Sequence, residues 1–386
     1  MRILIAHSFY RLPGGEDHYV EEQAKLLSQR HTVEVFAERN ADLVGGPTSA
    51  ARMLYSLPKK RKVEATLDDF RPDVVHVHNV YPSIGPAVHL AARERGIPIA
   101  MTLHNFRLRC PNGLMFTEGS LCRRCESGAY LHATFHRCFP TNRQAAAYAA
   151  ILWLHRFLMQ LEDAVSTFIV PSEFMRRRVT SWGIDPRRVR VVEHFVRRPP
   201  GSPNQTHSAA YGMFVGRLAA DKGLDVLLRA LRLAGDPPFL VVGGGPLMKK
   251  VQLLADELGL VNTRLTGWQQ RREVLQLLAD ARFVVVPSVK EETAPFSALD
   301  ALASGCPLVV SDRGALPEFV ESGGGLVSRA GDVADLAGKI TLLVSDDEYC
   351  LRASAEALSY ARRSLDPDRH LACLETVYEE LLSSKL

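Results

Sequence analysis

Short apolar runs that alternate with amphipathic segments constrain the fold of this chain more than any other feature of its sequence. The runs have the length of buried strands, and the segments between them place apolar residues three or four positions apart, as helices do. Strands and helices in alternation build parallel sheets with helices on both faces. The expected strands lie at residues 3–6, 32–36, 73–77, 97–101, 166–170 and 189–192, and then at 212–215, 239–242, 263–266, 283–286 and 307–310.

The alternation stops between residues 105 and 142, and it breaks again at the proline-rich stretch 197–204, which has no periodicity and is typical of a linker. A chain of 386 residues is also long for a single core. We therefore predict two facing, Rossmann-like, doubly wound α/β domains with a ligand cleft between the carboxyl ends of their strands. The predicted domains are residues 1–198, with an insertion at 105–142, and residues 205–365, followed by a helix at 366–386 that packs back on the first domain.

The net charge of +4 is unevenly distributed, because residues 1–198 carry nine excess positive charges and the remainder carries five excess negative charges. A basic half predicts an anionic partner, namely a phosphorylated acceptor, an acidic membrane surface or nucleic acid, unless its arginines are merely solvated. Nucleic acid is disfavoured, since basic and aromatic residues do not interleave on a recognisable module. No apolar run suits a signal peptide or a membrane span, so we expect a soluble, cytoplasmic protein.

Two motifs in the second half place cations and glycines directly after predicted strands. Gly216-Arg217 and Lys222 put two positive charges at a strand-to-helix turn, where a diphosphate would need neutralising. Gly243-Gly244-Gly245 forms a glycine loop that permits close approach of a ligand. Met248 breaks the G-x-G-x-x-G fingerprint, which disfavours a nicotinamide enzyme.

A third motif, residues 287–307, joins a buried strand to a loop with carboxylates and then to a helix that begins near Pro295. The free N–H groups at a helix start form a phosphate site. Asp300 lies about a turn and a half inside the helix, where a carboxylate can accept both hydroxyls of a ribose diol. Three motifs in this order indicate a nucleotide site.

With these motifs in place, the chain resembles the retaining glycosyltransferases of family 4, which have the GT-B architecture, over nearly its whole length. The resemblance rests on four stretches: Gly14-Gly15, Thr102-Leu103-His104-Asn105, Gly216-Arg217-Leu218 with Lys222-Gly223, and Glu292 to Asp300.

The resemblance implies a role for each matching residue. Glu292 would meet the hydroxyls of the donor sugar, and His104 would contact the transferred sugar. Arg217 and Lys222 would bind the diphosphate, with help from the backbone N–H groups of Gly15, Phe296 and Ser297. Asp300 stands where the family has glutamate; being one methylene shorter, it must meet the ribose more closely or through a water.

We expect transfer of a sugar from a nucleotide-diphosphate donor to a hydroxyl of a saccharide, lipid-linked or small-molecule acceptor. The resemblance implies retention through front-face attack, and we expect no catalytic metal, because two cations already stabilise the leaving diphosphate. The alternatives are another GT-B activity, such as an epimerase or an inverting transferase, and a non-catalytic nucleotide-sugar-binding protein.

The first half is expected to bind the acceptor. Glu16 or Asp17 either acts as a base for an acceptor hydroxyl or complements a helix N-terminus. The segment 144–162, with Trp153 and Phe157, fits a helix that rests on a membrane at its inner face or one that covers the sheet.

The insertion carries four cysteines, one pair of which is a C-x-x-C. Four thiolates with this spacing are typical of a structural zinc site, and reduced free thiols or a redox pair are the alternatives. The four are Cys110, Cys122, Cys125 and Cys138.

Overall fold

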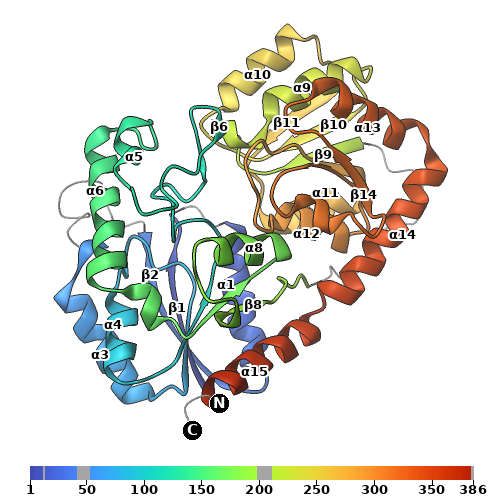
Figure 1. The fold of residues 1–386 in the computed structure, drawn as a ribbon. Coiled ribbons are helices and arrows are strands. Elements are labelled where there is room, and N and C mark those ends of the chain that lie inside the picture. The colour runs from blue at the N-terminus through green and yellow to red at the C-terminus, as the bar shows by residue number, and fades with distance from the viewer. Residues whose placement is uncertain (12–13, 41–52, 198–210, 384–386) are drawn as a thin grey trace. The chain divides into compact units, whose positions relative to one another are not determined.

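The computed structural model describes residues 1–11, 14–40, 53–197 and 211–383, and it divides into two compact units (Figure 1). Unit 1 comprises Met1–Glu118, Cys122–His194 and Pro367–Leu386, and unit 2 comprises Gly119–Leu121 and Phe195–Asp366. Apart from its first residue, the predicted linker at 197–204 lies outside the described residues. Each unit is described by itself below.

Unit 1 is built on a six-stranded parallel sheet in the order β2-β1-β3-β4-β7-β8. The predicted strands of the first half are confirmed with shifts of a few residues. The apolar side chains of the central strands are buried, whereas the edge strand at Thr32–Arg39 is largely exposed. The strands are β1 (Arg2–Phe9), β2 (Thr32–Arg39), β3 (Val74–Val77), β4 (Ile99–Thr102), β7 (Thr167–Val170) and β8 (Val189–Val191).

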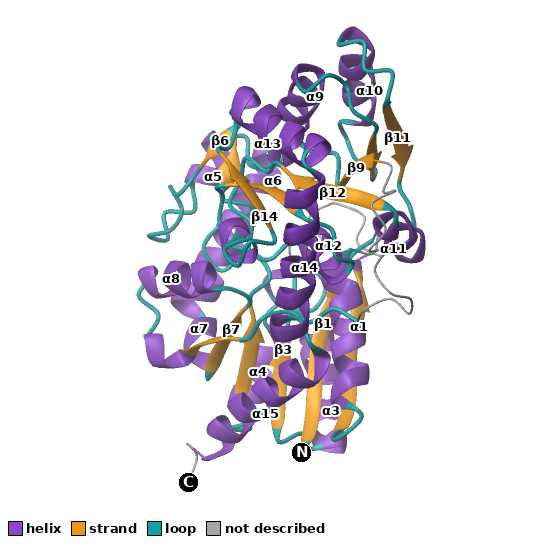
Figure 2. Ribbon diagram, turned by 90° about the vertical axis from the view of Figure 1, so that its right-hand side faces the viewer, coloured by secondary structure: helices purple, strands orange, loops and turns teal. Residues whose placement is uncertain are grey.

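Helices cover this sheet, and Figure 2 shows α15 in front of its strands. Side chains such as Leu4, Val75 and Phe168 form the core between the layers, and each contributes roughly 1.5–3 kcal/mol by its burial. The helices are α1 (Gly15–Leu27), α3 (Leu57–Phe70), α4 (Ala87–Glu94), α6 (Asn142–Trp153), α7 (Leu161–Ala164), α8 (Glu173–Ser181) and α15 (Pro367–Ser383).

Between β4 and α6 the alternation of strands and helices stops, as the sequence predicted. This segment holds only the short elements β5 (Phe116–Thr117), β6 (Ser120–Leu121) and α5 (His132–Phe135).

The single helix predicted over residues 144–162 is wrong in its second half. After α6 the chain widens into a π-helical turn, η2 (Leu154–Leu158), in which the N–H of Met159 bonds to the carbonyl of Leu154. Gln160 then adopts a left-handed conformation with φ of 50°, and the short α7 begins. The ring of His155 is held by two hydrogen bonds from outside the helix, and π-helical turns of this kind are frequent at functional sites.

Unit 2 has a second six-stranded parallel sheet, in the order β11-β10-β9-β12-β13-β14. The strand order reverses between β9 and β12, and this switch point is where doubly wound sheets bind ligands. The strands are β9 (Tyr211–Val215), β10 (Phe239–Val242), β11 (Thr263–Gly267), β12 (Ala281–Val286), β13 (Leu308–Ser311) and β14 (Gly325–Ser328).

The helices of unit 2 pack their apolar sides on this sheet and bury a core that includes Phe214, Leu227 and Phe283. They are α9 (Leu224–Leu233), α10 (Met248–Glu257), α11 (Arg271–Ala279), α12 (Phe296–Ala303), α13 (Val333–Ser345) and α14 (Asp347–Ser364). Among the described residues, no helix has the length and apolar character that crossing a membrane requires.

Candidate functional site

The loops that follow β9 and β12 meet at the switch point of unit 2. The two strands are neighbours, so the turns that leave their carboxyl ends start side by side. The N–H of Val289, in the second loop, donates to the carbonyl of Asp221, in the first, at 3.0 Å. Two of the three predicted motifs are therefore brought together by the fold.

Glu292 is the centre of this arrangement. Its carboxylate is buried and accepts from Nζ of Lys222 at 2.7 Å, from Nζ of Lys290 at 3.0 Å and from the hydroxyl of Ser288 at 2.6 Å. Burial alone would raise the pKa of Glu292, but the two ammonium charges and these hydrogen bonds lower it to about 2. Glu292 is therefore a charged carboxylate at neutral pH, held in one place by two lysines.

The guanidinium of Arg217 lies beside the same loop. Its Nη2 contacts the Asp221 carboxylate at 3.2 Å, while 54% of the Arg217 side chain remains exposed. The Lys222 side chain, next to Asp221 in sequence, is 19% exposed. Both predicted cations therefore stand at one strand-to-helix turn and keep accessible surface for an anion.

Two glycines let these loops pack backbone to backbone. Gly223 has φ of 68°, and a Cβ atom there would overlap the carbonyl oxygen of Pro287. A Cβ atom on Gly243 would likewise overlap the carbonyl oxygen of Gly216. The predicted Gly244 has more room, with the Cβ of Trp268 3.5 Å from the position of an added Cβ.

Helix α12 begins one residue later than its proline suggested, since Pro295 is the N-cap and Phe296 and Ser297 are the first helical residues. Asp300 is buried in this helix, and both of its oxygens accept from the guanidinium of Arg271 at 2.6 Å. Burial raises the pKa of Asp300, and the charge of Arg271 opposes that shift. A ribose diol would therefore share this carboxylate with Arg271.

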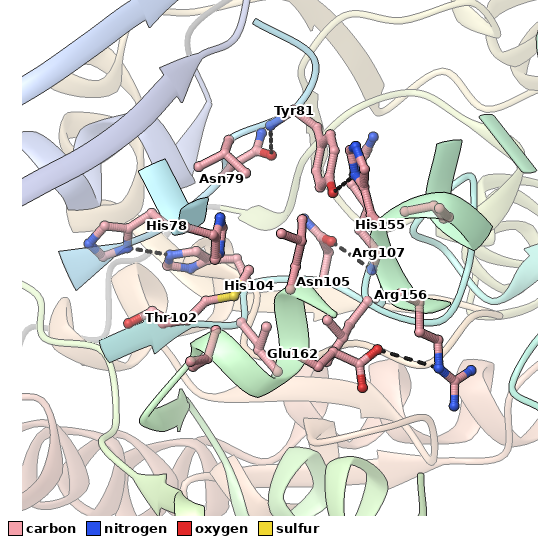
Figure 3. Close-up of a pocket in the computed structure, with 18 of the residues that line it drawn as sticks. His78, Asn79, Tyr81, Thr102, His104, Asn105, Arg107, His155, Arg156 and Glu162 are labelled. Atoms are coloured by element: carbon pink, nitrogen blue, oxygen red, sulfur yellow. Dashed lines mark hydrogen bonds and ion pairs between the residues drawn. The ribbon is translucent and has the colours of Figure 1, made fainter. Parts of the chain in front are cut away.

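Unit 1 contains a pocket of about 690 Å³ at the carboxyl end of its sheet (Figure 3). Its apolar walls include Val80, Met101 and Leu103, and its polar lining comes from turns after β3 and β4 and from the segment η2–α7. The predicted residues Glu16 and His104 both line it. Its other polar lining residues are His78, Asn79, Tyr81, His89, Thr102, Asn105, Arg107, His155, Arg156 and Glu162.

Several polar atoms of this lining are buried without a hydrogen-bond partner among the described residues. They include Nδ2 of Asn79, Nε of Arg107 and Oε1 of Glu16. A buried polar atom left unpaired costs about 1–3 kcal/mol, so such atoms around one cavity indicate a polar ligand that satisfies them. Burial also raises the pKa of Glu16, whose other oxygen accepts from the Tyr10 hydroxyl at 3.0 Å.

Asp17 has a different environment from Glu16. It is buried, and its carboxylate contacts Nε2 of His7 at 2.9 Å and the backbone N–H groups of Tyr10 and Gly14 at 3.2 and 3.1 Å. These contacts tie Tyr10 and Gly14 to the first turn of α1, of which Gly15 is the first residue. Asp17 does not line the pocket of Figure 3.

The four cysteines of the insertion all line a second, smaller cavity of about 280 Å³. All four are free thiols, and burial raises the pKa of Cys125 to about 12. Among the parts of the chain that the structure describes, no group of three or more His, Cys, Asp or Glu side chains could hold a metal ion as it lies. The predicted zinc site is thus not seen, although its four residues, Cys110, Cys122, Cys125 and Cys138, share one cavity.

Sequence reasoning missed several residues of both sites. Lys290 stands two positions before Glu292, so its charge was visible, but its orientation depends on how the loop folds. Arg271 lies 29 positions from Asp300, and nothing in the sequence pairs them. In unit 1, Arg156 and Glu162 reach the pocket because η2 and α7 break a helix that looked continuous.

Two family descriptions match the chain, and together they cover most of it. Residues 13–198 match the description "Glycosyltransferase Family 4", and residues 203–360 match "Glycosyl transferases group 1". Among curated proteins, a D-inositol 3-phosphate glycosyltransferase of Mycobacterium sp. (strain KMS) is 32% identical over 89% of this chain and 80% of its own length.

Another relative, an uncharacterized glycosyltransferase of Methanocaldococcus jannaschii, is 28% identical over 44% of this chain, and the match spans about half of that relative, 48% of its length. Among solved structures, Anabaena HepE in complex with UDP and glucose superposes with a TM-score of 0.70. That alignment covers 98% of this chain and 100% of the Anabaena chain at 18% identity, which shows a shared fold.

Proposed function

This chain belongs to the group 1, family 4 glycosyltransferases of GT-B architecture, and on that premise we propose that it uses a nucleotide-diphosphate sugar as donor and transfers the sugar with retention and without a catalytic metal. The donor would bind in unit 2. The acceptor, a saccharide, lipid-linked or small molecule, would enter the pocket of unit 1.

The observation that carries the proposal is the cluster at the switch point of unit 2. A buried carboxylate, Glu292, holds Lys222 and Lys290 in place, and Arg217 stands beside them with most of its surface open. A fixed cationic turn next to the start of α12 is suited to a pyrophosphate, because both the side chains and the helix dipole favour negative charge there.

In the proposed reaction the bond between the anomeric carbon and the diphosphate oxygen breaks, and the electron pair leaves with the phosphate. Arg217 and Lys222 stabilise the negative charge that develops on the leaving group. The acceptor oxygen bonds to the anomeric carbon on the same face, and its proton passes to the departing phosphate oxygen. Glu292 hydrogen-bonds the hydroxyls of the sugar during transfer.

The absence of a catalytic metal is proposed because two placed cations supply the charge that a divalent ion would supply. The chain does contain one Asp-x-Asp triplet, Asp366-Pro367-Asp368, a pattern with which metal-dependent transferases hold an ion. It spans the start of α15 and does not follow a strand of the second sheet. Full activity in the presence of a strong chelator is the expected result, and loss of activity restored by a divalent ion would contradict it.

The function is tested by screening UDP-, GDP- and ADP-sugars for thermal stabilisation and for release of the nucleoside diphosphate. A donor at 100 times its Kd should stabilise the protein by about 2.7 kcal/mol. The anomeric configuration of the product, read by NMR, distinguishes retention from inversion, and release of free epimerised sugar would indicate an epimerase. Stabilisation without any turnover would favour a nucleotide-sugar-binding protein.

A membrane-bound acceptor is favoured by the surface around α5, α6 and η2. Five large apolar side chains are exposed there, with exposed fractions from 44% for Phe157 to 76% for Phe135. Exposed arginines of the same region would complement anionic lipid headgroups. The apolar residues are Leu131, Phe135, Trp153, Phe157 and Leu158, and the arginines are Arg123, Arg124, Arg137 and Arg143.

Co-sedimentation with vesicles tests this contact. The protein should bind vesicles that contain anionic lipid and not purely zwitterionic ones, and Phe135→Ser with Leu158→Ser should abolish binding while an exposed apolar change in unit 2, Val261→Ser, should not. Equal binding by both variants would contradict the proposal. A cytoplasmic location at the inner face of the membrane is part of the same proposal.

A structural zinc ion in the insertion is also proposed. Thiolates are soft ligands that suit zinc, and the four side chains line one cavity, but they must turn towards a shared centre to bind it. One zinc per chain, lost in Cys122→Ser and kept in Cys373→Ser, is the expected elemental analysis. A folded protein that takes up no zinc from supplemented medium would refute it. The proposed ligands are Cys110, Cys122, Cys125 and Cys138.

A further inference from the structure

One guanidinium in the pocket of unit 1 has no ion-pair partner among the described residues. It belongs to Arg107, which lines the pocket of Figure 3 and whose side chain makes no hydrogen bond within that part of the chain. Its Nε is also buried away from solvent. An unpaired donor costs more when it carries charge, so a ligand with a negatively charged oxygen is the partner that would satisfy Arg107 best.

A second donor of this pocket comes from Asn79. Its Oδ1 lies 3.1 Å from the backbone nitrogen of Tyr81. A backbone N–H can only donate, so the atom that faces it is the amide oxygen, and the orientation of the amide is fixed. The NH₂ group of Asn79 is then buried without a hydrogen-bond partner among the described residues. Two groups of the pocket can therefore donate to a ligand and cannot accept from it.

The carboxylate of Glu162 lines the same pocket, but other cations already balance its charge. The guanidinium of Arg109 contacts both of its oxygens, Oε2 at 2.7 Å, and Nε of Arg156 lies 3.6 Å from Oε1. Arg109 is fully buried, so its charge and that of Glu162 neutralise each other inside the fold. Glu162 therefore leaves the charge of Arg107 unbalanced.

The other carboxyl group of the pocket, Glu16, makes little use of Arg107. Burial raises the pKa of Glu16, while His7, the Tyr10 hydroxyl and, least of the three, Arg107 oppose that shift. A carboxyl group with a raised pKa takes up a proton more readily, and it then repels a bound anion less than an ordinary carboxylate would.

The loop after β4 holds Arg107 in place. Its backbone N–H donates to Oδ1 of Asn105 at 3.0 Å. Gly113 lies against the guanidinium, because a Cβ atom added there would stand 3.6 Å from Nη2 and 3.7 Å from Nε of Arg107. A side chain that is already packed in this way loses less freedom when a ligand binds.

We propose that the pocket of unit 1 recognises its acceptor through an oxyanion, a phosphate or a carboxylate, that binds Arg107 and the NH₂ group of Asn79. The excess of positive charge in residues 1–198 favours the same class of ligand. The role of the bound molecule as an acceptor rests on the proposed function, whereas the binding of the anion does not.

The Nε–H group of Arg107 reports binding directly in ¹H–¹⁵N spectra of the full chain. Its signal is the one that disappears in Arg107→Lys, or in Arg107→Gln if the lysine variant does not fold. Inorganic phosphate and acetate, titrated separately, distinguish the two kinds of anion. The Arg107 signal should shift and saturate with at least one of them in the millimolar range. The Nε–H of Arg109, equally buried but paired through its Nη atoms with Glu162, is the matched control and should not shift.

Two variants assign the site. Asn79→Asp keeps an oxygen for the N–H of Tyr81 but puts a second oxygen where the NH₂ group was, so the affinity for the anion should fall by about tenfold or more. Lys222→Ala removes a cation from unit 2 and should bind the anion at Arg107 as the parent does.

An Arg107 signal that neither anion moves overturns the inference. So does a shift that disappears in Lys222→Ala, because the anion would then act from unit 2, and so does an unchanged affinity in a folded Asn79→Asp variant. Saturable binding at Arg107 in a protein that cleaves no nucleotide sugar would instead refute the proposed function and leave the anion site intact. Sugar transfer by a protein whose Arg107 signal neither anion moves would do the reverse.

Discussion

At the scale of single residues, the central feature of the unit 2 site is the carboxylate of Glu292, which two lysines share. Glu292 has three donors, and its two lysines differ in exposure, since the side chain of Lys222 is 19% exposed and that of Lys290 12%. Burial, only partly offset by Glu292, lowers the pKa of Lys290. Lys222 is thus the better placed of the two to meet a ligand, while Lys290 chiefly balances the buried carboxylate.

Replacing Lys222 by alanine should reduce kcat with the nucleotide-sugar donor by about 100- to 1,000-fold, because one source of charge stabilisation for the leaving phosphate is lost. Steady-state kinetics measure the effect. Lys250→Ala, an exposed lysine of α10 in the same unit, is the matched control and should keep normal rates. Near-normal turnover in Lys222→Ala would place the diphosphate elsewhere.

The pair Arg271–Asp300 offers a test by stability. Arg271→Ala leaves a buried carboxylate without its cation, which should destabilise unit 2 by roughly 3 kcal/mol. Adding Asp300→Asn to that variant should recover part of the loss, since the buried charge is removed as well. Urea unfolding of the parent, both single variants and the double variant gives the coupling energy. Additive effects of the two changes would show that the pair is not coupled.

The alternating pattern predicted that Lys222 and Asp300 lie near the carboxyl edge of a parallel sheet, where the turns after its strands meet, and the family resemblance singled out Glu292. It did not pair Asp300 with Arg271, because that contact depends on how α11 and α12 pack. It also did not separate Glu16 from Asp17, whose neighbouring side chains meet different surroundings once α1 has formed.

At the scale of elements, regular periodicity was a sound guide and tertiary contacts explain its failures. Helices α8, α9 and α12 each follow a strand, as the alternating pattern predicted, and each buries apolar side chains. The segment 144–162 keeps helical periodicity, yet the hydrogen bonds of the His155 ring to Tyr81 and Leu54 coincide with a π-helical turn. Strand β14 is short and partly exposed, so its sequence has no apolar run from which it could be predicted.

A substitution in the turn between β9 and α9 tests how the two loops of the site pack. Gly223→Ala adds a left-handed alanine, at about 1–2 kcal/mol, and also drives a Cβ atom into the Pro287 carbonyl, so the two loops of the site must separate. Unfolding free energies and donor binding should both fall. Gly235→Ala, at the other end of α9, is the control. Gly235 has φ of 86° and open space around it, so this variant measures the cost of a left-handed alanine without a steric clash. Equal losses of unfolding free energy and of donor binding in the two variants would contradict a close contact between the loops.

At the scale of the whole molecule, the two units differ in their titratable cores. Every described histidine lies in unit 1. Burial lowers the pKa of His76 and His194 to about 3 and that of His89 and His370 to about 4, from an ordinary 6.5. Below pH 6.5 the unfolded chain binds protons on these side chains that the folded unit does not, so the stability of unit 1 rises with pH.

Acidification should therefore loosen unit 1 before unit 2. Between pH 6.5 and pH 5 each of these four histidines should cost unit 1 about 2 kcal/mol. Hydrogen exchange followed by mass spectrometry, corrected for the intrinsic pH dependence of exchange, should show protection lost first in β3 and β4 and retained in β9 and β12. Simultaneous loss in both units would contradict the assignment of the acid-sensitive core.

The hydrogen bond between Tyr378 and His76 also has a consequence for the order of events during synthesis. Helix α15 is translated after the residues of unit 2, yet it belongs to unit 1, most of which is translated before them. In the nascent chain, His76 therefore lacks its contact with Tyr378 until residues 195–366 and most of α15 have been translated. This differs from the common case in which N-terminal domains fold first. Slower translation of residues 195–366 would then lengthen the time for which a chaperone has to protect the incomplete unit.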